Sequence, residues 1–305
     1  MCKNLRTLKV NDTIIVKSLS DYLAEVSKIS NHWDEYDPNV YRYYYRGQFS
    51  KEWGLTPSFF REHSNRTNVK LVEYNLLQQA SSYCWKWIKD FKTYTEKLVF
   101  FQHFGLRTRL LDVTTNPLVA LFFACYLEKP SDEEKEQDGI VYIGNGQPID
   151  NTIIEFISEL IFTNSTPRLR EDYVEDLFYK HLGNKKIPFG EIYTEYLMQP
   201  HFFYAPNSND RINAQSGAFI MSPVYDFHGG NWSPIALSDI DYDKYKESNN
   251  SFINKRIIIP HDKKNVIYKE LAICGIHEAS LFPDAEHMMN YIERDPQSLE
   301  TIKPK

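Results

Sequence analysis

One stretch of the chain, FQHFGLRTRLLDVTTNPLVALFFA, sets charged and polar residues inside a strand and a helix that are otherwise apolar. TRLLDV has the composition of a strand. Asn116 followed by Pro117 is a strong helix start, because asparagine caps helices and proline suits the first helical position. A strand that holds Arg109 and Asp112 among leucines brings charge near the interior, which is costly unless the charge is paired or meets an anionic ligand. The stretch therefore predicts a strand-to-helix turn that lines a ligand cleft.

The chain is long enough for a substantial core, and its charge balance is acidic. It has 305 residues, of which 42% are hydrophobic and 15% aromatic, and its formal net charge is −6. This composition indicates a globular chain with either a thick aromatic core or a stacking cleft for a planar ligand. The average field repels nucleic acid, so RNA or DNA binding would need a local basic patch.

Cysteine spacing and hydropathy indicate in which cellular compartment the chain is expected. Cys2, Cys84, Cys125 and Cys274 show no CxxC spacing, which argues against a disulfide framework and against a cysteine-based zinc site. The best apolar run, residues 118–127, is about half of the roughly 20 residues that a membrane span needs. We therefore expect a soluble, cytoplasmic chain with reduced thiols, no metal and no membrane partner.

The pattern along the chain predicts an α+β fold, with a mainly antiparallel sheet core and helical insertions. Strands are expected at residues 41–48, 108–113, 139–144, 201–205, 216–223 and 255–260. Helices are expected at residues 18–29, 69–91, 95–105, 114–128, 151–162, 171–182, 265–275 and 283–294. The helices at 69–91 and 95–105 are expected to pack as a pair, and the acidic residues 128–138 to form a solvated loop. We divide the chain into a helical lead-in at 1–40, a domain at 41–295 with a helical insertion at about 150–198, and a tail at 296–305.

Three blocks hold more polar residues among apolar ones than packing requires, namely YRGQ at 45–48, residues 101–117 and RINAQSGAF at 211–219. Arg46 and Asp112 form either a buried ion pair between two strands or part of a ligand site. His103 is either a cap at a helix C-terminus or an acid–base group. Gln215 suits a sheet edge as well as a ribose hydroxyl. The TTN sequence at 114–116 suits a helix N-terminus, which can also bind a phosphate.

These blocks resemble the FRG domain family, named for an aromatic-Arg-Gly motif that is YRGQ here. YRGQFSKEWGLTPSFFR resembles its first block, FFQHFGLRTRLLDVTTNPLVALFFA its second, RINAQSGAF its third and GIHEASLFPD its last, which together span about Tyr43 to Ile292. Arg107 stands where the family usually has proline, and Val113 where it often has tryptophan. The family itself implies no assigned activity.

The order of the blocks is also similar to arginine-type ADP-ribosyltransferases, which cleave NAD. That resemblance implies that Arg46 contacts the NAD phosphates and that Thr114 or Thr115 takes the place of a Ser-Thr-Ser strand. The catalytic glutamate of that class falls on Gly217, so a carboxylate must come from elsewhere. Asp112 is the best replacement in the matched blocks, although Arg109 could neutralise it.

The resulting hypothesis is an NAD-dependent mono-ADP-ribosyltransferase-like effector of the toxin or antiphage defence type, with NAD as substrate. Its catalytic residues would be Arg46, Asp112, Gln215 and His103. Its nucleotide-binding residues would be Tyr45, Gly47, Gln48, Arg109, Thr114, Thr115, Asn116 and Arg211. A tyrosine from Tyr43 to Tyr45 would stack on nicotinamide.

Two other functions fit the same residues. One is a binding module that senses NAD or another nucleotide without turnover and meets a regulatory partner protein through its inserted helices. The other is a metal-free nuclease or nucleotide hydrolase that uses His103 and Asp112. An acceptor of ADP-ribose could be protein, or nucleic acid held by Lys86, Lys89 and Lys92 beside Trp85 and Trp87.

Overall fold

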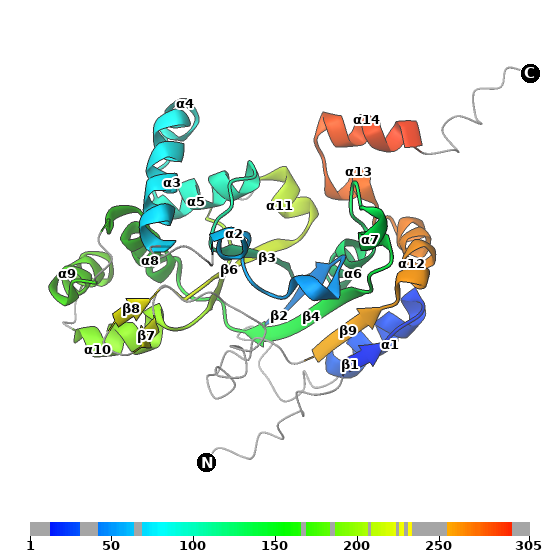
Figure 1. The fold of residues 1–305 in the computed structure, drawn as a ribbon, viewed down its shortest axis with the longest axis horizontal. Coiled ribbons are helices and arrows are strands. Elements are labelled where there is room, and N and C mark those ends of the chain that lie inside the picture. The colour runs from blue at the N-terminus through cyan, green and yellow to red at the C-terminus, as the bar shows by residue number, and fades with distance from the viewer. Residues whose placement is uncertain are drawn as a thin grey trace, which may run out of the picture.

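A seven-stranded sheet organises the computed structural model, which describes residues 13–30, 42–63, 69–165, 169–183, 187–206, 209–223, 226–228, 231–233 and 255–294 (Figure 1). The strand order is β1-β9-β4-β2-β3-β6-β5. The strands are β1 (Thr13–Ile15), β2 (Arg42–Gln48), β3 (Leu110–Thr114), β4 (Gly139–Gly146), β5 (His201–Phe203), β6 (Gly217–Met221) and β9 (Lys255–Ile259). Only β1 and β9 pair in parallel within this sheet, so the predicted mainly antiparallel α+β fold is confirmed.

A separate pair, β7 (Asp226–His228) and β8 (Asn231–Ser233), forms a small antiparallel sheet. The helices are α1 (Leu19–Ser30), η2 (Lys51–Trp53), α2 (Ser58–His63), α3 (Val69–Tyr83), α4 (Trp85–Ile88), α5 (Tyr94–His103), α6 (Pro117–Cys125), α7 (Asp132–Lys135), α8 (Asn151–Thr163), α9 (Glu171–Leu182), α10 (Phe189–Ile192), η3 (Tyr193–Leu197), α11 (Asp210–Ala214), α12 (His261–Ile273), α13 (Glu278–Leu281) and α14 (Ala285–Arg294). Within the described residues, no helix combines the length and apolar character that crossing a membrane requires.

Several elements differ from the sequence-based expectation. The helix expected at 69–91 is divided at Cys84 into α3 and α4, in a run of aromatic residues that favour helices only weakly. The stretch expected to be a loop at 128–138 contains α7, because Ser131 and Glu134 form a capping box. Both α3 and α5 pack against α8 in one core, and Phe91, within the expected helix 69–91, contacts Phe100 of α5.

The predicted lead-in at 1–40 contributes more than a helix, since β1 joins the sheet beside β9. Residues 150–198, predicted as a helical insertion, hold α8, α9, α10 and the π-helical turn η3. The domain boundaries drawn from the sequence stay predictions.

Two groups of helices cover different halves of one face of the sheet. α1, α6 and α12 share a core with Tyr45 of β2, Val141 of β4 and Ile257 of β9. α3, α5, α8 and α9 share a second core with Leu110 of β3 and Phe219 of β6. Figure 1 shows the two groups on either side of β2 and β3. The sheet therefore presents part of this face between them.

The glycine of the YRGQ motif allows α6 to lie directly against the sheet. A Cβ atom on Gly47 would stand 1.7 Å from the carbonyl oxygen of Ala120, and one on Gly139 would stand 2.2 Å from that of Ala124. Both obstacles are helix backbone, which cannot rotate away as a side chain can. Contact between β2 and α6 at this distance is therefore possible only with glycine.

We predict that Gly47→Ala lowers the free energy of unfolding by about 3 kcal/mol, the upper end of the usual cost of overpacking, because α6 must move away from β2. Urea unfolding followed by circular dichroism measures the change. Gly190→Ala is the matched control: it lies in α10, a Cβ there meets nothing within 4 Å, and its stability should be unchanged or slightly raised. Equal stability of the Gly47→Ala protein and the wild type would contradict the packing described here.

Candidate functional site

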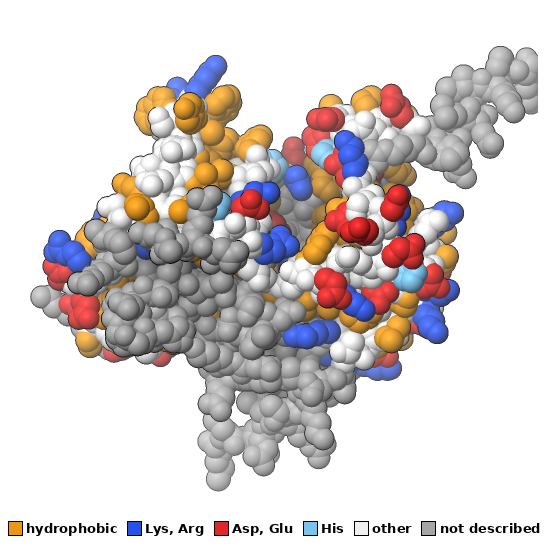
Figure 2. All heavy atoms as spheres, viewed as in Figure 1, with side chains coloured by type: hydrophobic (Ala, Val, Ile, Leu, Met, Phe, Trp, Pro, Cys, Tyr) orange, Lys and Arg blue, Asp and Glu red, His pale blue; other side chains and the backbone are white. Residues whose placement is uncertain are grey.

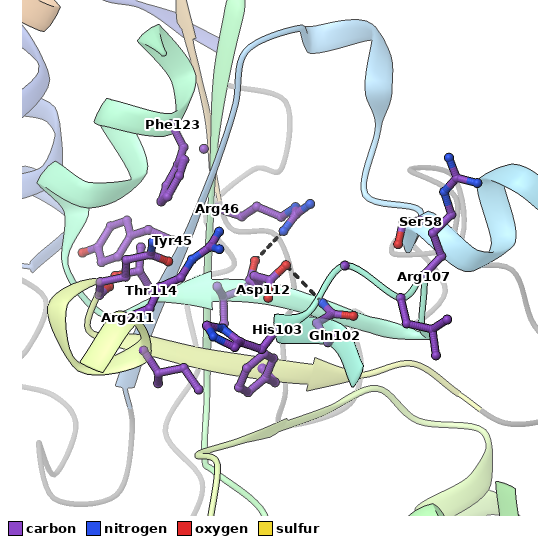
Figure 3. A pocket seen from close by; sticks show the side chains of 17 residues that line it. Tyr45, Arg46, Ser58, Gln102, His103, Arg107, Asp112, Thr114, Phe123 and Arg211 are labelled. Atoms are coloured by element: carbon purple, nitrogen blue, oxygen red, sulfur yellow. Dashed lines mark hydrogen bonds between the residues drawn. The ribbon is translucent and has the colours of Figure 1, made fainter. Parts of the chain in front are cut away.

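A cavity of about 440 Å³ opens over the sheet between the two helical groups (Figure 3). Eight of the residues predicted for the site line it, namely Tyr45, Arg46, Gly47, His103, Asp112, Thr114, Arg211 and Gln215. Gln48, Arg109, Thr115 and Asn116, which were predicted with them, do not line it. In Figure 3, Tyr45 and Phe123 lie toward one end and Arg107 and Ser58 toward the other, with Asp112 between them.

Arg46 bridges a gap between β2 and β3. In these two described strands the register pairs only Tyr45 with Thr114, whereas β2 pairs with β4 along its whole length. The Nη1 atom of Arg46 donates a hydrogen bond to the main-chain carbonyl oxygen of Asp112. This contact replaces the side-chain ion pair between Arg46 and Asp112 that the sequence left open, and it holds the guanidinium at the cavity.

Asp112 presents its carboxylate to the cavity and is held in place by Gln102. The Nε2 atom of Gln102 lies 3.1 Å from Oδ2 of Asp112 and 3.2 Å from the carbonyl oxygen of Leu110. The hydroxyl of Thr108 donates to the other end of the same amide, which fixes its orientation. Among the described residues that line the cavity, Asp112 is the only Asp or Glu.

Arginine side chains supply most of the charge of the cavity lining. Arg46, Arg107 and Arg211 line the cavity. Burial, followed by repulsion from Arg46 and Arg107, lowers the pKa of the nearby Arg61. Such an arrangement of like charges favours an anionic ligand, which would relieve the repulsion.

Two of these arginines have partners of different kinds. Arg107 pairs with Glu62 at 3.3 Å in an exposed contact. The guanidinium of Arg211 lies 4.9 Å from the centre of the Phe282 ring, a stacking contact that leaves its edge available for hydrogen bonds. Neither contact uses the carboxylate of Asp112.

His103 ends α5 and lines the cavity near Arg211, as Figure 3 shows. Its pKa is lowered, first by burial and then by the positive charge of Arg211, while Asp284 and Asp112 oppose the shift. The ring is therefore neutral at pH 7 and has a nitrogen that can accept a proton. His103 thus lies in the last turn of α5 and faces the cavity, and its acid–base role stays a prediction.

One tyrosine of the YRYYYRGQ strand faces this cavity. Tyr45 is buried against it, and burial, with a smaller contribution from Tyr43, raises its pKa to about 12, so the hydroxyl stays protonated. Tyr44 points to the opposite face of the sheet, where its ring stacks on Phe202 at 3.9 Å. Tyr45, with Phe123 of α6, is thus the aromatic wall.

Arg109 belongs to the core and not to the cavity. Its side chain is 1% exposed and makes a two-pronged contact with the carboxylate of Glu73 in α3, while Nη1 donates to the carbonyl oxygen of Pro223 at 3.0 Å. The predicted nucleotide-binding role of Arg109 has no support in this position, and its charge does not neutralise Asp112. Gln48 is also buried, and its amide donates to the carbonyl oxygen of Gly54 at 2.7 Å.

The TTN sequence fastens the end of β3 to the residues that precede β6. The hydroxyl of Thr114 donates to the carbonyl oxygen of Gln215 at 2.7 Å, and that of Thr115 donates to Ser216 at 3.3 Å. Asn116 caps α6 by accepting from the amide of Leu118 at 2.9 Å. The helix-start prediction is confirmed, and only Thr114 of the three reaches the cavity.

The last predicted block supplies a side-chain amide and no carboxylate. Gln215 lines the cavity, and its Nε2 atom donates to the carbonyl oxygen of Leu281 at 3.1 Å. Gly217 is paired with Thr114, and a Cβ atom there would lie 3.2 Å from Ile212. The position at which the sequence analysis expected the catalytic glutamate of the transferase resemblance is therefore crowded as well as uncharged.

Sequence reasoning missed Gln102 and Phe123 as site residues. Gln102 directly precedes His103 in the block that the sequence analysis singled out, so a signal for it was present. Phe123 lies in a helix that is apolar on every side, so no periodicity distinguishes the residue that faces the cavity. Among the described residues, no three His, Cys, Asp or Glu side chains gather as metal ligands.

Comparison with known proteins supports the first of the two resemblances. Residues 41–134 match the sequence model of the FRG domain, a segment that runs from β2 to α7 and includes the YRGQ and TTNPLVALFFA blocks. No curated protein and no solved structure matches the chain. The FRG signature is thus confirmed over this segment, and it contains Tyr45, Arg46, His103, Asp112 and Thr114 of the cavity.

We predict that Glu73→Gln lowers the free energy of unfolding by about 3–5 kcal/mol, because it leaves the guanidinium of Arg109 buried without a counter-charge. Chemical unfolding measures the loss. Glu62→Gln is the matched control, since its pairing with Arg107 is exposed and its removal should cost less than about 1 kcal/mol. Similar losses of unfolding free energy in the two variants would show that the buried Arg109–Glu73 pair stabilises the fold no more than the exposed pair.

Proposed function

We propose that the cavity binds NAD and that the chain is an ADP-ribosyltransferase-like enzyme that cleaves the bond between nicotinamide and ribose. The observation that carries the proposal is the position of Asp112, which is the only carboxylate among the described lining residues, is held by Gln102 and shares the cavity with three arginines. A dinucleotide has the matching features, since it joins a negatively charged pyrophosphate to a ribose that becomes cationic when nicotinamide leaves. The cavity volume of about 440 Å³ lies within the usual range for small-molecule sites.

Each cavity wall suits one part of that substrate. Arg46 would bind the pyrophosphate through charge-assisted hydrogen bonds, with Arg107 or Arg211 completing the site. Tyr45 and Phe123 would stack on the nicotinamide ring. Gln215 would orient the ribose, which its position beside Thr114 allows.

The reaction follows from the charge that develops on the sugar. The bond between the ribose carbon and the pyridinium nitrogen breaks, its electron pair moves to that nitrogen, and nicotinamide leaves as a neutral molecule. Asp112 would stabilise the resulting oxocarbenium-like ribose, an electrostatic effect that grows stronger when the bound substrate displaces water from around the exposed carboxylate. An acceptor then adds to the same carbon, and the neutral ring of His103 would take the proton that the acceptor loses.

A second function is favoured by one specific observation, the absence of a carboxylate at Gly217. A nucleotide sensor needs the arginines and the aromatic wall but needs no group that stabilises an oxocarbenium ion. The two functions differ in whether bound NAD is broken, so a single pair of measurements distinguishes them.

We expect Asp112→Asn to lower the rate of nicotinamide release by about 100-fold or more while NAD affinity changes by only a few-fold, because the amide keeps the shape but loses the charge. Chromatography of NAD incubated with the purified protein measures release, and calorimetry measures affinity. NAD that binds and stays intact with the wild-type protein, in the presence of cell lysate as a source of acceptors, would favour the sensor.

We expect Arg46→Ala to weaken NAD binding by about 10- to 100-fold, the usual effect of losing charge-assisted hydrogen bonds. Arg42→Ala is the matched control, because Arg42 lies on the same strand, is exposed and does not line the cavity. Circular dichroism confirms that both variants are folded. If Arg46→Ala bound NAD as tightly as the wild type, the cavity would not be the nucleotide site.

A further inference from the structure

The end of α3 and the whole of α4 expose three large aromatic side chains that are close together in the sequence. Tyr83 is 84% exposed, and Trp85 and Trp87 are each 63% exposed. In Figure 2 hydrophobic side chains surround the top of this helical segment, and basic side chains project beside them. Tryptophan side chains are usually largely buried, so this group, which we call the α4 tip (residues 83–92), indicates a surface that a partner covers.

The tip is anchored independently of its exposed rings. Ile88 is 3% exposed and belongs to the core formed with α5 and α8. Phe91 packs edge-on against Phe100, with 5.4 Å between the ring centres. The two tryptophans can therefore be removed without opening the core, which makes them suitable probes of binding.

The charge of the tip is opposite to that of the whole chain. Lys86, Lys89 and Lys92 are exposed there, and Asp90 is the only acid in residues 83–92, whereas the full sequence has a net charge of −6. Figure 1 shows α4 at the far end of α3, beyond α5 and α8. Salt screens charges over about 8 Å under physiological conditions, so a projecting tip is largely free of the acidic charge of the body.

The order of the residues indicates which negatively charged partner fits. Neighbours two positions apart on a helix point about 200° away from each other, so Trp85 and Trp87 lie on different sides of α4 with Lys86 between them. A membrane surface requires its apolar residues on one side and its basic residues on the other. A flexible, negatively charged polymer with aromatic rings can instead wrap around the helix. Its rings then contact the tryptophans and its charges contact the lysines.

We propose that the α4 tip binds single-stranded nucleic acid. Bases stack on the rings of Trp85 and Trp87, and the three lysines contact the phosphates between them. A duplex binds less well, because its bases are already stacked and paired and do not present their faces to the tryptophans. None of the residues of the tip lines the cavity, so this binding is separate from the NAD chemistry proposed above.

The proposal is tested with the full chain and fluorescein-labelled 20-nucleotide single strands of RNA and of DNA, by fluorescence anisotropy without NAD. We expect Trp85→Ala and Trp87→Ala each to weaken binding by about 10-fold, the usual effect of losing a stacked base. The matched control is Tyr179→Ala in α9, which removes another aromatic ring that is 51% exposed and should leave binding unchanged.

Salt dependence measures the contribution of the lysines. With three phosphate contacts, the logarithm of the binding constant should fall with the logarithm of salt concentration with a slope of about −2, and Lys86→Gln with Lys89→Gln should reduce that slope by about 1.4. Equal affinity of wild type and tryptophan variants would overturn the proposal, as would equal affinity for duplex and single strand. Binding to phosphatidylserine vesicles but not to oligonucleotides would assign the tip to a membrane instead. Because NAD is absent, a negative result here leaves the nicotinamide-release measurement unaffected.

Discussion

Contact between the backbones of β2 and α6 at Gly47 sets the position of both walls of the cavity. The strand carries Tyr45 and Arg46, and the helix carries Phe123, so a shift of either element would separate groups that now face one cavity. Each residue of the Tyr-Arg-Gly motif therefore has a structural role that explains why that residue type stands there. The tyrosine forms a wall, the arginine spans the gap to β3, and the glycine permits the approach of the helix.

The arginines of this chain have two different roles. One is buried and paired with a carboxylate, and the others line the cavity. Arg109 is enclosed with Glu73 and contributes to the join between α3 and β3. Arg46, Arg107 and Arg211 surround the cavity, where the only carboxylate among the described lining residues is Asp112. A buried pair of opposite charges and a cluster of like charges have different consequences: the first stabilises a contact between elements, and the second favours an anion.

Local signals in the sequence predicted much of the fold and part of the site. Asn116 and Pro117 predicted the start of α6, because capping depends on neighbouring residues alone. Arg109 could not be assigned in this way, since its partner Glu73 lies 36 residues earlier and only the packing of α3 brings the two together. The pairing of β1 with β9 likewise depends on tertiary contacts, whereas the capping box of α7 was readable from Ser131 and Glu134.

The sparse pairing between β2 and β3 divides the sheet into two parts along a seam. One part holds β1, β9, β4 and β2, and the other holds β3, β6 and β5. The strand pairing joins the two parts at Tyr45 and Thr114, and the hydrogen bond of the Arg46 side chain is a second link. The cavity lies along this seam, and Arg46 both lines the cavity and bridges the two parts of the sheet. A ligand that binds the guanidinium of Arg46 would therefore contact one of the few links between the two parts.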